Sequence, residues 1–401
     1  MDTQIFSNLR RGVAQTVCAG TVAFMAWAGD AVLEAQVPRP APARVAAPQT
    51  LRQAAERKGL LMGFFMSHYW FLRQGDPHNA SVSGPYTELL NRVAGREFNL
   101  VAMPVFMSQI SPKPNRNDWF YSDYVINYAQ RYGMAVQGTP LVYSLPVILP
   151  PWVKELEQKQ RWEALRAAMK REVSAVVGRY RGKVKSWIVV NEAVDYDASA
   201  NGWTLAPNVW QKAHAQSGNP EWTYIDEAFN AARTADRDAV LIYNDFANAE
   251  VSGKSDFIHT LLKGMKSRKV PVDAVGFQMH LNKEGADAPW LSGGLNIDSF
   301  KRNMQRFADL GLDIYITELD MKLEDMSPRS LQRQAEVYAQ IVDACRAQPR
   351  FKGLLQWGLY DKYNWLNDLP TEKVKPLYPL IYDTACNPKP AYYSLREALT
   401  K

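Results

Sequence analysis

The stretch 184–195, VKSWIVVNEAVD, joins a short apolar run to two polar residues, Asn191 and Glu192. A run of this length between two helical patterns is typical of a buried strand in a parallel sheet. The residues before and after it carry apolar side chains at helical spacing: Leu165, Met169, Val173, Val176 and Val177 on one side, and Tyr224, Ile225, Ala228, Phe229 and Ala232 on the other. The stretch therefore predicts a strand between two helices.

The same alternation extends in both directions from this stretch. Together with it, the sequence predicts eight strands, at 60–65, 98–103, 135–143, 184–191, 240–244, 274–280, 313–318 and 352–357. Eight strands, each followed by a helix, indicate an α/β fold, a (β/α)8 TIM barrel that forms one domain over 51–400. A doubly wound open sheet shares the alternation, but it normally has a glycine-rich phosphate turn, which Gly59 and Gly63 do not supply.

Composition excludes several classes of protein. The 401 residues are 47% hydrophobic and 22% charged, which is typical of a globular chain rather than a disordered, collagen-like or polytopic membrane protein. The net charge of +6 is spread without runs of one sign, so we expect no nucleic-acid partner. With 12 Trp and 19 Tyr, the chain is rich in the flat, amphipathic rings on which sugars stack.

The amino terminus has the pattern of an export signal. Arg10 and Arg11 precede an apolar segment from Val13 to Ala28 that ends in small residues, so 1–28 is predicted to be a signal peptide. The segment is short for a membrane span, although an uncleaved anchor is the alternative. The Pro- and Ala-rich residues 29–50 are expected to form a linker, and the protein to be secreted or periplasmic.

The cysteines and histidines do not form a metal motif. Once Cys18 leaves with the signal, Cys345 and Cys386 remain, either as one disulfide or as two buried thiols. The five scattered histidines and these cysteines nowhere approach ligand spacing, so we expect neither a metal nor a cofactor. We expect a monomer whose partner is a polysaccharide substrate.

Two carboxylates end strands that face each other across the predicted barrel. Chemistry in such barrels takes place at the carboxyl ends of the strands, where Glu192 follows the fourth strand and Glu318 ends the seventh. A single Glu at such a place is more often an ordinary ion-pair partner. Two of them across the mouth match glycoside hydrolysis, in which one carboxylic acid protonates the leaving oxygen and a second carboxylate attacks or activates water.

Other residues are expected at the same mouth. Gln278 and His280 end the sixth strand, and His280 placed between Glu318 and Asp320 would keep a nucleophile ionised and oriented. Trp357 and Trp365 follow the eighth strand, where they are either core residues or part of a lid.

The residues at these strand ends resemble those of glycoside hydrolase family 10, the retaining endo-β-1,4-xylanases. WxVVNEAxD at 187–195 resembles the acid/base motif of the family, and ITELD at 316–320 resembles its nucleophile motif. Four more stretches match in order and spacing: VPVDAVGFQMHL at 270–281, LIYND at 241–245, WGLYDKYNWL at 357–366 and YDTACNPKPAYYSL at 382–395. The resemblance covers essentially all of 51–400.

The resemblance implies roles for individual residues. It assigns the general acid/base to Glu192, the nucleophile to Glu318, and recognition of the sugar 2-hydroxyl to Asn191. It further implies that Gln278 and His280 flank the nucleophile, and that both bind the substrate together with Trp357, Trp365, Tyr143 and Asn244.

The chain departs from the family pattern in the residues that bind the glycone part of the substrate. Pro104, Val105 and Ser108 align with a Glu-Asn pair and a Lys of the family, and Thr139 aligns with a His. Each lost hydrogen bond weakens sugar binding by about 0.5–3 kcal/mol. The expected substrate is xylan-like, with a bacterial envelope polysaccharide or exopolysaccharide as the alternative. A weakly catalytic polysaccharide-binding or assembly factor is the competing class.

Overall fold

A computed structural model describes residues 49–67, 88–287, 294–369 and 374–401. The predicted signal peptide and all but the last two residues of the predicted linker lie outside these ranges. Within them, no helix is both long enough and apolar enough to cross a membrane.

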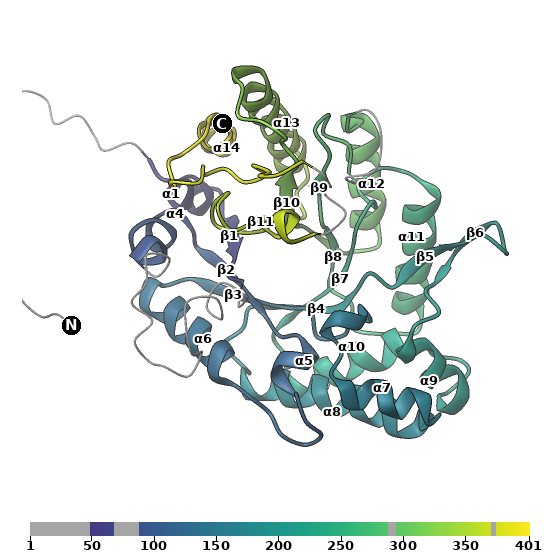
Figure 1. Cartoon of the computed structure of the whole chain (residues 1–401). Helices are drawn as coiled ribbons and strands as arrows, with labels where there is room; N and C mark the ends of the chain where they lie inside the picture. Colours follow the sequence, from purple (N-terminus) through teal and green to yellow (C-terminus); the bar gives the residue numbers. More distant parts are fainter. Residues whose placement is uncertain (1–48, 68–87, 288–293, 370–373) are drawn as a thin grey trace, which may run out of the picture. The chain divides into compact units, whose positions relative to one another are not determined.

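Eight parallel strands form a closed barrel, as predicted from the sequence (Figure 1). The strands follow one another around the barrel in chain order, and the last pairs with the first: β1 (Leu61–Phe65), β2 (Leu100–Pro104), β3 (Ala135–Thr139), β4 (Ser186–Asn191), β7 (Val240–Asp245), β8 (Ala274–Phe277), β10 (Asp313–Met321) and β11 (Phe351–Gln356). A short strand, β9 (His280–Leu281), pairs with the end of β10, and β5 (Val194–Asp197) forms a hairpin with β6 (Gly202–Leu205).

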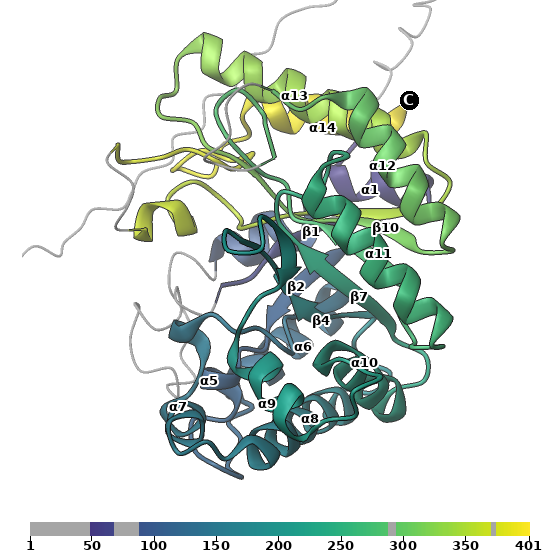
Figure 2. The same cartoon turned by 90° about the vertical axis from the view of Figure 1, so that its right-hand side faces the viewer.

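Helices surround the barrel, and Figure 2 shows several of them beside the strands in a side view. The longer ones are α6 (Phe120–Tyr132), α8 (Trp162–Arg179), α10 (Tyr224–Ala235), α11 (Gly253–Ser267), α12 (Ile297–Asp309), α13 (Pro328–Arg346) and α14 (Pro390–Thr400). The shorter ones are α1 (Leu51–Arg57), α4 (Gly95–Glu97), α5 (Met107–Ile110), α7 (Pro151–Gln158) and α9 (Val209–Ser217). The apolar faces predicted for 165–177 and 224–232 are buried in α8 and α10.

Three strands end three or more residues away from the end that the sequence predicts. β3 ends at Thr139 because Pro140 has no N–H to donate to the ladder. The sixth strand is interrupted after Phe277, since Met279 adopts a left-handed backbone (φ 64°), and pairing resumes at His280. The seventh strand continues to Met321, where it pairs with β9.

A close approach of backbone to an indole links β3 to β4. A Cβ atom at Gly138 would lie 2.0 Å from a ring carbon of Trp187, which is fully buried. Only glycine leaves room for that ring, so β3 and β4 pack tightly below the strand ends.

The two ends of the described domain are tied together. The Tyr392 hydroxyl of α14 donates to Glu97 (2.9 Å), and the backbone N–H of Leu51 donates to the same carboxylate oxygen (3.1 Å). The first and last helices thereby contact each other and complete the outer ring.

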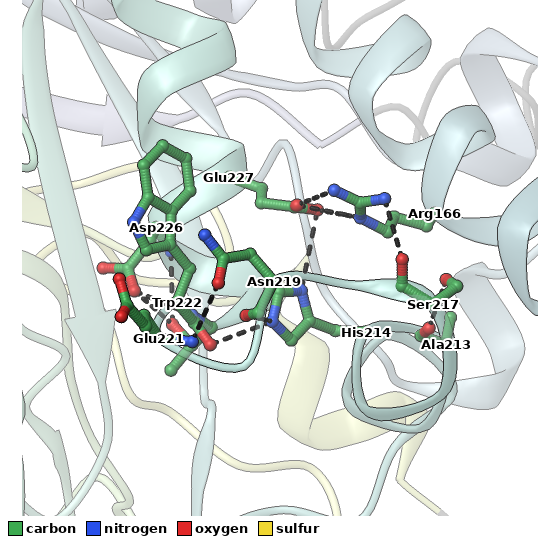
Figure 3. Close-up of polar contacts among 10 residues, drawn as sticks. Arg166, Ala213, His214, Ser217, Asn219, Glu221, Trp222, Asp226 and Glu227 are labelled. Atoms are coloured by element: carbon green, nitrogen blue, oxygen red, sulfur yellow. Dashed lines mark hydrogen bonds and ion pairs between the residues drawn. The ribbon is translucent and has the colours of Figure 1, made fainter.

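A buried polar cluster joins α8, α9 and α10 on the outside of the barrel (Figure 3). The guanidinium of Arg166 contacts both carboxylate oxygens of Glu227, and His214 donates from Nε2 to the carbonyls of Asn219 (3.1 Å) and Trp222 (2.9 Å). His214 Nδ1 lies 3.7 Å from Glu227. These contacts fix the α9–α10 connection and leave His214 with a structural role.

Cys345 and Cys386 are free thiols, and both are buried. The disulfide alternative is therefore excluded, and the alternative of two buried thiols is confirmed. Burial raises the pKa of the Cys386 thiol to about 11, so it stays protonated at neutral pH.

Candidate active site

Glu192 directly follows the end of β4 in an unusual backbone conformation. Its φ of 51° lies in the left-handed region, which a residue with a Cβ rarely adopts. Its N–H donates to the carbonyl of Asn244 at the end of β7 (3.0 Å), which holds this conformation in place. Such a strained conformation persists only where the surrounding structure holds it, and residues of this kind cluster at functional sites.

Asn244 lies between the two carboxylates and connects them. Its side-chain N–H2 donates to Glu318 Oε1 (2.7 Å) and to Asn191 Oδ1 (2.7 Å), and its oxygen accepts from the Thr317 hydroxyl (2.6 Å). Both N–H donors and the oxygen of the Asn244 amide make hydrogen bonds, so its orientation is fixed. Gly276 makes room for it, since a Cβ there would lie 2.3 Å from Asn244 Oδ1.

Glu192 is partly exposed and receives hydrogen bonds on both carboxyl oxygens. Oε1 accepts from Gln278 Nε2 (2.8 Å) and from Asn191 Nδ2 (3.2 Å), whereas Oε2 contacts the Tyr143 hydroxyl. Burial raises the pKa of Glu192, and the charge of Glu318 adds to the rise. The hydrogen bonds from Tyr143 and Gln278 oppose it. The environment therefore favours a protonated carboxyl more than water would.

Glu318 is buried, and a cationic side chain lies beside it. Its Oε2 accepts from His280 Nε2 (3.1 Å), and Nδ1 of the same ring lies 2.9 Å from Asp320. Burial alone would lower the pKa of His280, but the charges and hydrogen bonds of Asp320 and Glu318 outweigh it and raise that pKa well above its usual range. His280 is thus an imidazolium that donates to carboxylates from both nitrogens.

The two carboxyl groups therefore have opposite environments. Burial and the nearby charge of Glu318 favour the acid form of Glu192, whereas Glu318 touches the positive charge of His280. When the environments of two titratable groups favour opposite protonation states, one group can act as an acid and the other as a base or nucleophile.

Aromatic rings line the same mouth. Trp357, just after β11, stacks on Phe65 of β1 with ring centroids 3.9 Å apart. Trp365 packs against His280 at 4.8 Å and donates its indole N–H to Asp320 (2.6 Å). Both indoles are half-buried, so each presents part of a flat apolar face at the mouth.

Two further carboxyl groups near these residues, those of Asp245 and Asp287, are buried. Asp245 pairs with Lys254 (2.7 Å) and accepts from the Tyr243 hydroxyl (2.8 Å), and all three groups are fully buried. Asp287 accepts from the N–H of Ala249 (2.9 Å), and burial raises the pKa of Asp287 to about 6. The charge of Asp245 adds to the rise in the pKa of Glu192, and the charge of His280 partly opposes the rise in the pKa of Asp287, so both carboxyls are coupled to the site.

The ten residues predicted from the sequence for this site meet at the mouth of the barrel. Hydrogen bonds connect nine of them, and Trp357 joins through its edge contact with His280 at 6.2 Å. Sequence reasoning missed Thr317, Asp245 and Lys254. Thr317 adjoins the nucleophile motif and Asp245 ends a predicted strand, so their positions signalled them, whereas nothing linked Lys254 to the site.

Within the described residues, no group of three or more His, Cys, Asp and Glu side chains is arranged to hold a metal ion. The polar side chains of the site instead hydrogen-bond one another.

A comparison with protein families agrees with this arrangement of the site. Residues 50–398 match the model of glycosyl hydrolase family 10, which is nearly the whole of the described chain. The chain belongs to that family. It is therefore an O-glycosyl hydrolase on a (β/α)8 barrel, as the motifs around Glu192 and Glu318 indicated.

Relatives of this family 10 hydrolase are similar to it in sequence and structure over most of their length. Endo-1,4-beta-xylanase B of Thermotoga neapolitana is 34% identical over 354 residues, which cover 87% of this chain and 91% of that protein. The crystal structure of xylanase 10B from Thermotoga maritima is similar with a TM-score of 0.72 and 35% identity, covering 88% of this chain and 98% of that one. Xylanase 10B from Thermotoga petrophila, solved with xylobiose, has the same TM-score and coverage at 34% identity.

Proposed function

We propose that this family 10 hydrolase cleaves a β-1,4-linked, xylan-type polysaccharide with retention of configuration, using Glu192 as general acid/base and Glu318 as nucleophile. The observation that carries the proposal is the opposite environments of the two carboxyls. Glu192 has a raised pKa, and Glu318 accepts from the imidazolium of His280. A retaining glycosidase needs one protonated and one ionised carboxyl at the same bond.

In the first step, Glu318 attacks the anomeric carbon while Glu192 gives its proton to the glycosidic oxygen. The bond between that carbon and oxygen breaks, the aglycone leaves as an alcohol, and the sugar becomes an ester of Glu318. In the second step, Glu192 takes a proton from water as the water oxygen attacks the same carbon, and Glu318 leaves as a carboxylate. Two inversions give net retention.

The surrounding residues position these two groups. Asn191 and Asn244 link the carboxyls through amide hydrogen bonds. We propose that Asn191 recognises the sugar 2-hydroxyl, as the family resemblance implies. Asp320 orients His280, whose charge stabilises ionised Glu318 when the ester bond breaks.

The substrate assignment rests on the relatives, which are named endo-1,4-beta-xylanases. One observation favours a second candidate, a bacterial envelope polysaccharide or exopolysaccharide. Pro104, Val105 and Thr139 are buried at the ends of β2 and β3, where polar sugar contacts occur in the family pattern. A glycone site rebuilt in this way suits a substrate with fewer hydroxyl contacts there.

The experiment is a reducing-sugar assay on xylan, mixed-linkage glucan, cellulose and bacterial exopolysaccharides, with Glu318→Ala as the inactive control. We expect release from xylan that the control abolishes. Release from an exopolysaccharide alone would select the second candidate. Polysaccharide binding without hydrolysis of any substrate, including an activated aryl β-xyloside, would instead identify a binding or assembly factor.

We further propose that the protein acts outside the cytoplasm as a monomer. Arg10, Arg11 and the apolar segment 13–28 support export. Mass spectrometry of the mature chain should find an amino terminus after Ala28, and light scattering should give the mass of one chain. A full-length chain confined to the cytoplasm, or a stable dimer, would contradict these proposals.

A further inference from the structure

Tyr143 reaches Glu192 because the segment after β3 runs along β4. The N–H groups of Leu141 and Val142 donate to the carbonyls of Ile188 and Val189 (both 2.9 Å), and the N–H of Asn191 donates back to Val142 (3.0 Å). These bonds fix the segment against the strand that carries the acid/base. Tyr143 therefore has a defined position beside Glu192, not that of a mobile loop residue.

A second contact fixes Tyr143 from the other side. The indole N–H of Trp210 in α9 donates to the Tyr143 carbonyl (3.3 Å), and the Trp210 side chain is buried. The phenol is half-buried, and its hydroxyl contacts Glu192 Oε2. Backbone and side chain of Tyr143 are thus both constrained.

The hydrogen bonds of Glu192 decide where its proton resides. Oε1 accepts from two amide N–H groups, those of Gln278 and Asn191, and an amide nitrogen cannot accept a proton in return. A proton on Oε1 would face these donors, so the acid form carries its proton on Oε2. The hydroxyl of Tyr143 contacts this oxygen.

A phenol hydroxyl matches both states of that oxygen. It donates when Glu192 is ionised, and it accepts from Oε2–H when Glu192 is protonated, by rotation of one O–H bond. An amide N–H or an indole N–H can serve only the ionised state. The acid/base of a retaining enzyme changes state in each half-reaction, so its partner must serve both.

We propose that Tyr143 is a positioning residue for the acid/base, holding the transferred proton on Glu192 Oε2 in one half-reaction and stabilising the carboxylate in the next. This role rests on the proposed function of Glu192. It differs from the sugar contact that the sequence resemblance implies for Tyr143.

The charged and titratable groups around Glu192 define the expected pH effect. They are Glu318 on β10 with His280 beyond it, and Asp245 on β7, which pairs with Lys254. Tyr143→Phe leaves all of these in place and removes one hydrogen bond to the carboxylate. The phenol binds both forms of Glu192, but its hydrogen bond to the charged carboxylate is stronger than its bond to the neutral acid, so it lowers the pKa of Glu192. Its loss therefore raises this pKa, and the acid form persists to higher pH.

The test compares the pH dependence of kcat/KM for Tyr143→Phe and the unchanged enzyme on an unactivated aryl β-xyloside. We expect the basic limb to move up by about one pH unit, the size of effect that one hydrogen bond produces. KM should change less than threefold. Tyr128→Phe is the matched control, because it removes a buried hydroxyl on helix α6 that donates to the Leu90 carbonyl (2.7 Å) and makes no hydrogen bond to any described residue of the site.

The outcomes separate this inference from the proposed function. An unmoved basic limb would overturn the role of Tyr143, and so would a tenfold rise in KM with an unmoved limb, which identifies a sugar contact. If the unchanged enzyme hydrolyses no aryl β-glycoside, the proposed function itself fails. If the variant is too slow for a profile, carboxyl 13C NMR of Glu192 reads the same titration directly, and an unshifted midpoint would also refute the inference.

Discussion

Asp320→Asn tests the charge arrangement around the nucleophile. The carboxylate of Asp320 accepts from His280 Nδ1 (2.9 Å) and from Trp365 Nε1 (2.6 Å). Asparagine has the same shape but one acceptor oxygen for these two donors, and it has no charge. The substitution therefore removes the negative partner of the His280 imidazolium and leaves one buried donor unpaired.

The size of the effect on stability follows from the hydrogen bond that is lost. A hydrogen bond to a charged group contributes about 1.5–3 kcal/mol. At 1.36 kcal/mol per unit, its loss should lower the pKa of His280 by about 1–2 units. Because the folded-state pKa of His280 is raised, its contribution to stability is fully present below about pH 6.5, the unfolded value. It disappears as the pH rises through the folded value.

We expect Asp320→Asn to lower the free energy of unfolding by about 1.5–3 kcal/mol at pH 5, with a smaller loss at pH 9. Nitrogen NMR of 15N-histidine protein should show the His280 ring titrating at lower pH than in the unchanged chain. The control is Asp226→Asn, which removes a buried carboxylate paired with Arg268 (2.9 Å) outside the mouth. An unchanged His280 titration would refute the reasoning, even if stability falls.

Three further predictions concern other parts of the site. Glu192→Ala should slow hydrolysis of substrates with poor leaving groups by orders of magnitude but keep the glycosylation step rapid with a dinitrophenyl glycoside. When azide is added, the product should be a β-azide, as NMR of the product would show. Because burial raises the pKa of Asp287, Asp287→Asn should stabilise the fold above pH 6 by up to about 3 kcal/mol and change little below about pH 4 in denaturant titrations. Gly276→Ala should displace Asn244 and lower kcat at least about tenfold, whereas Gly178→Ala, where a Cβ meets nothing within 4 Å, should not.

The barrel could be predicted because each strand is a continuous apolar run between helical patterns. The strand ends were harder to predict, because they depend on single residues. Pro140 ends β3 four residues before the predicted end, and the left-handed Met279 interrupts the sixth strand. Neither effect appears in a hydrophobic pattern, since Leu141 and Val142 continue the apolar run after the strand has ended.

That the residues of the site lie together could be predicted, because they follow strand ends, which a barrel brings to one mouth. Contacts between distant segments could not be predicted. The bond from Trp365 to Asp320 depends on how the loop after β11 folds back, and the bond from Tyr143 to Glu192 depends on the path after Pro140. Lys254 lies at the start of α11, where an exposed lysine is the ordinary expectation, yet it is buried against Asp245.

The central claim is that Glu318 forms a covalent bond to the sugar. Incubation with a dinitrophenyl 2-deoxy-2-fluoro-β-xylobioside should trap this intermediate. The fluorine slows both steps, but the activated leaving group restores the speed of the first step only, so the glycosyl-enzyme accumulates. Peptide mass spectrometry should then find one added fluorosugar on Glu318, and none in Glu318→Ala. An active enzyme that releases dinitrophenol without an adduct on Glu318, or that carries the adduct on another residue, would contradict the mechanism.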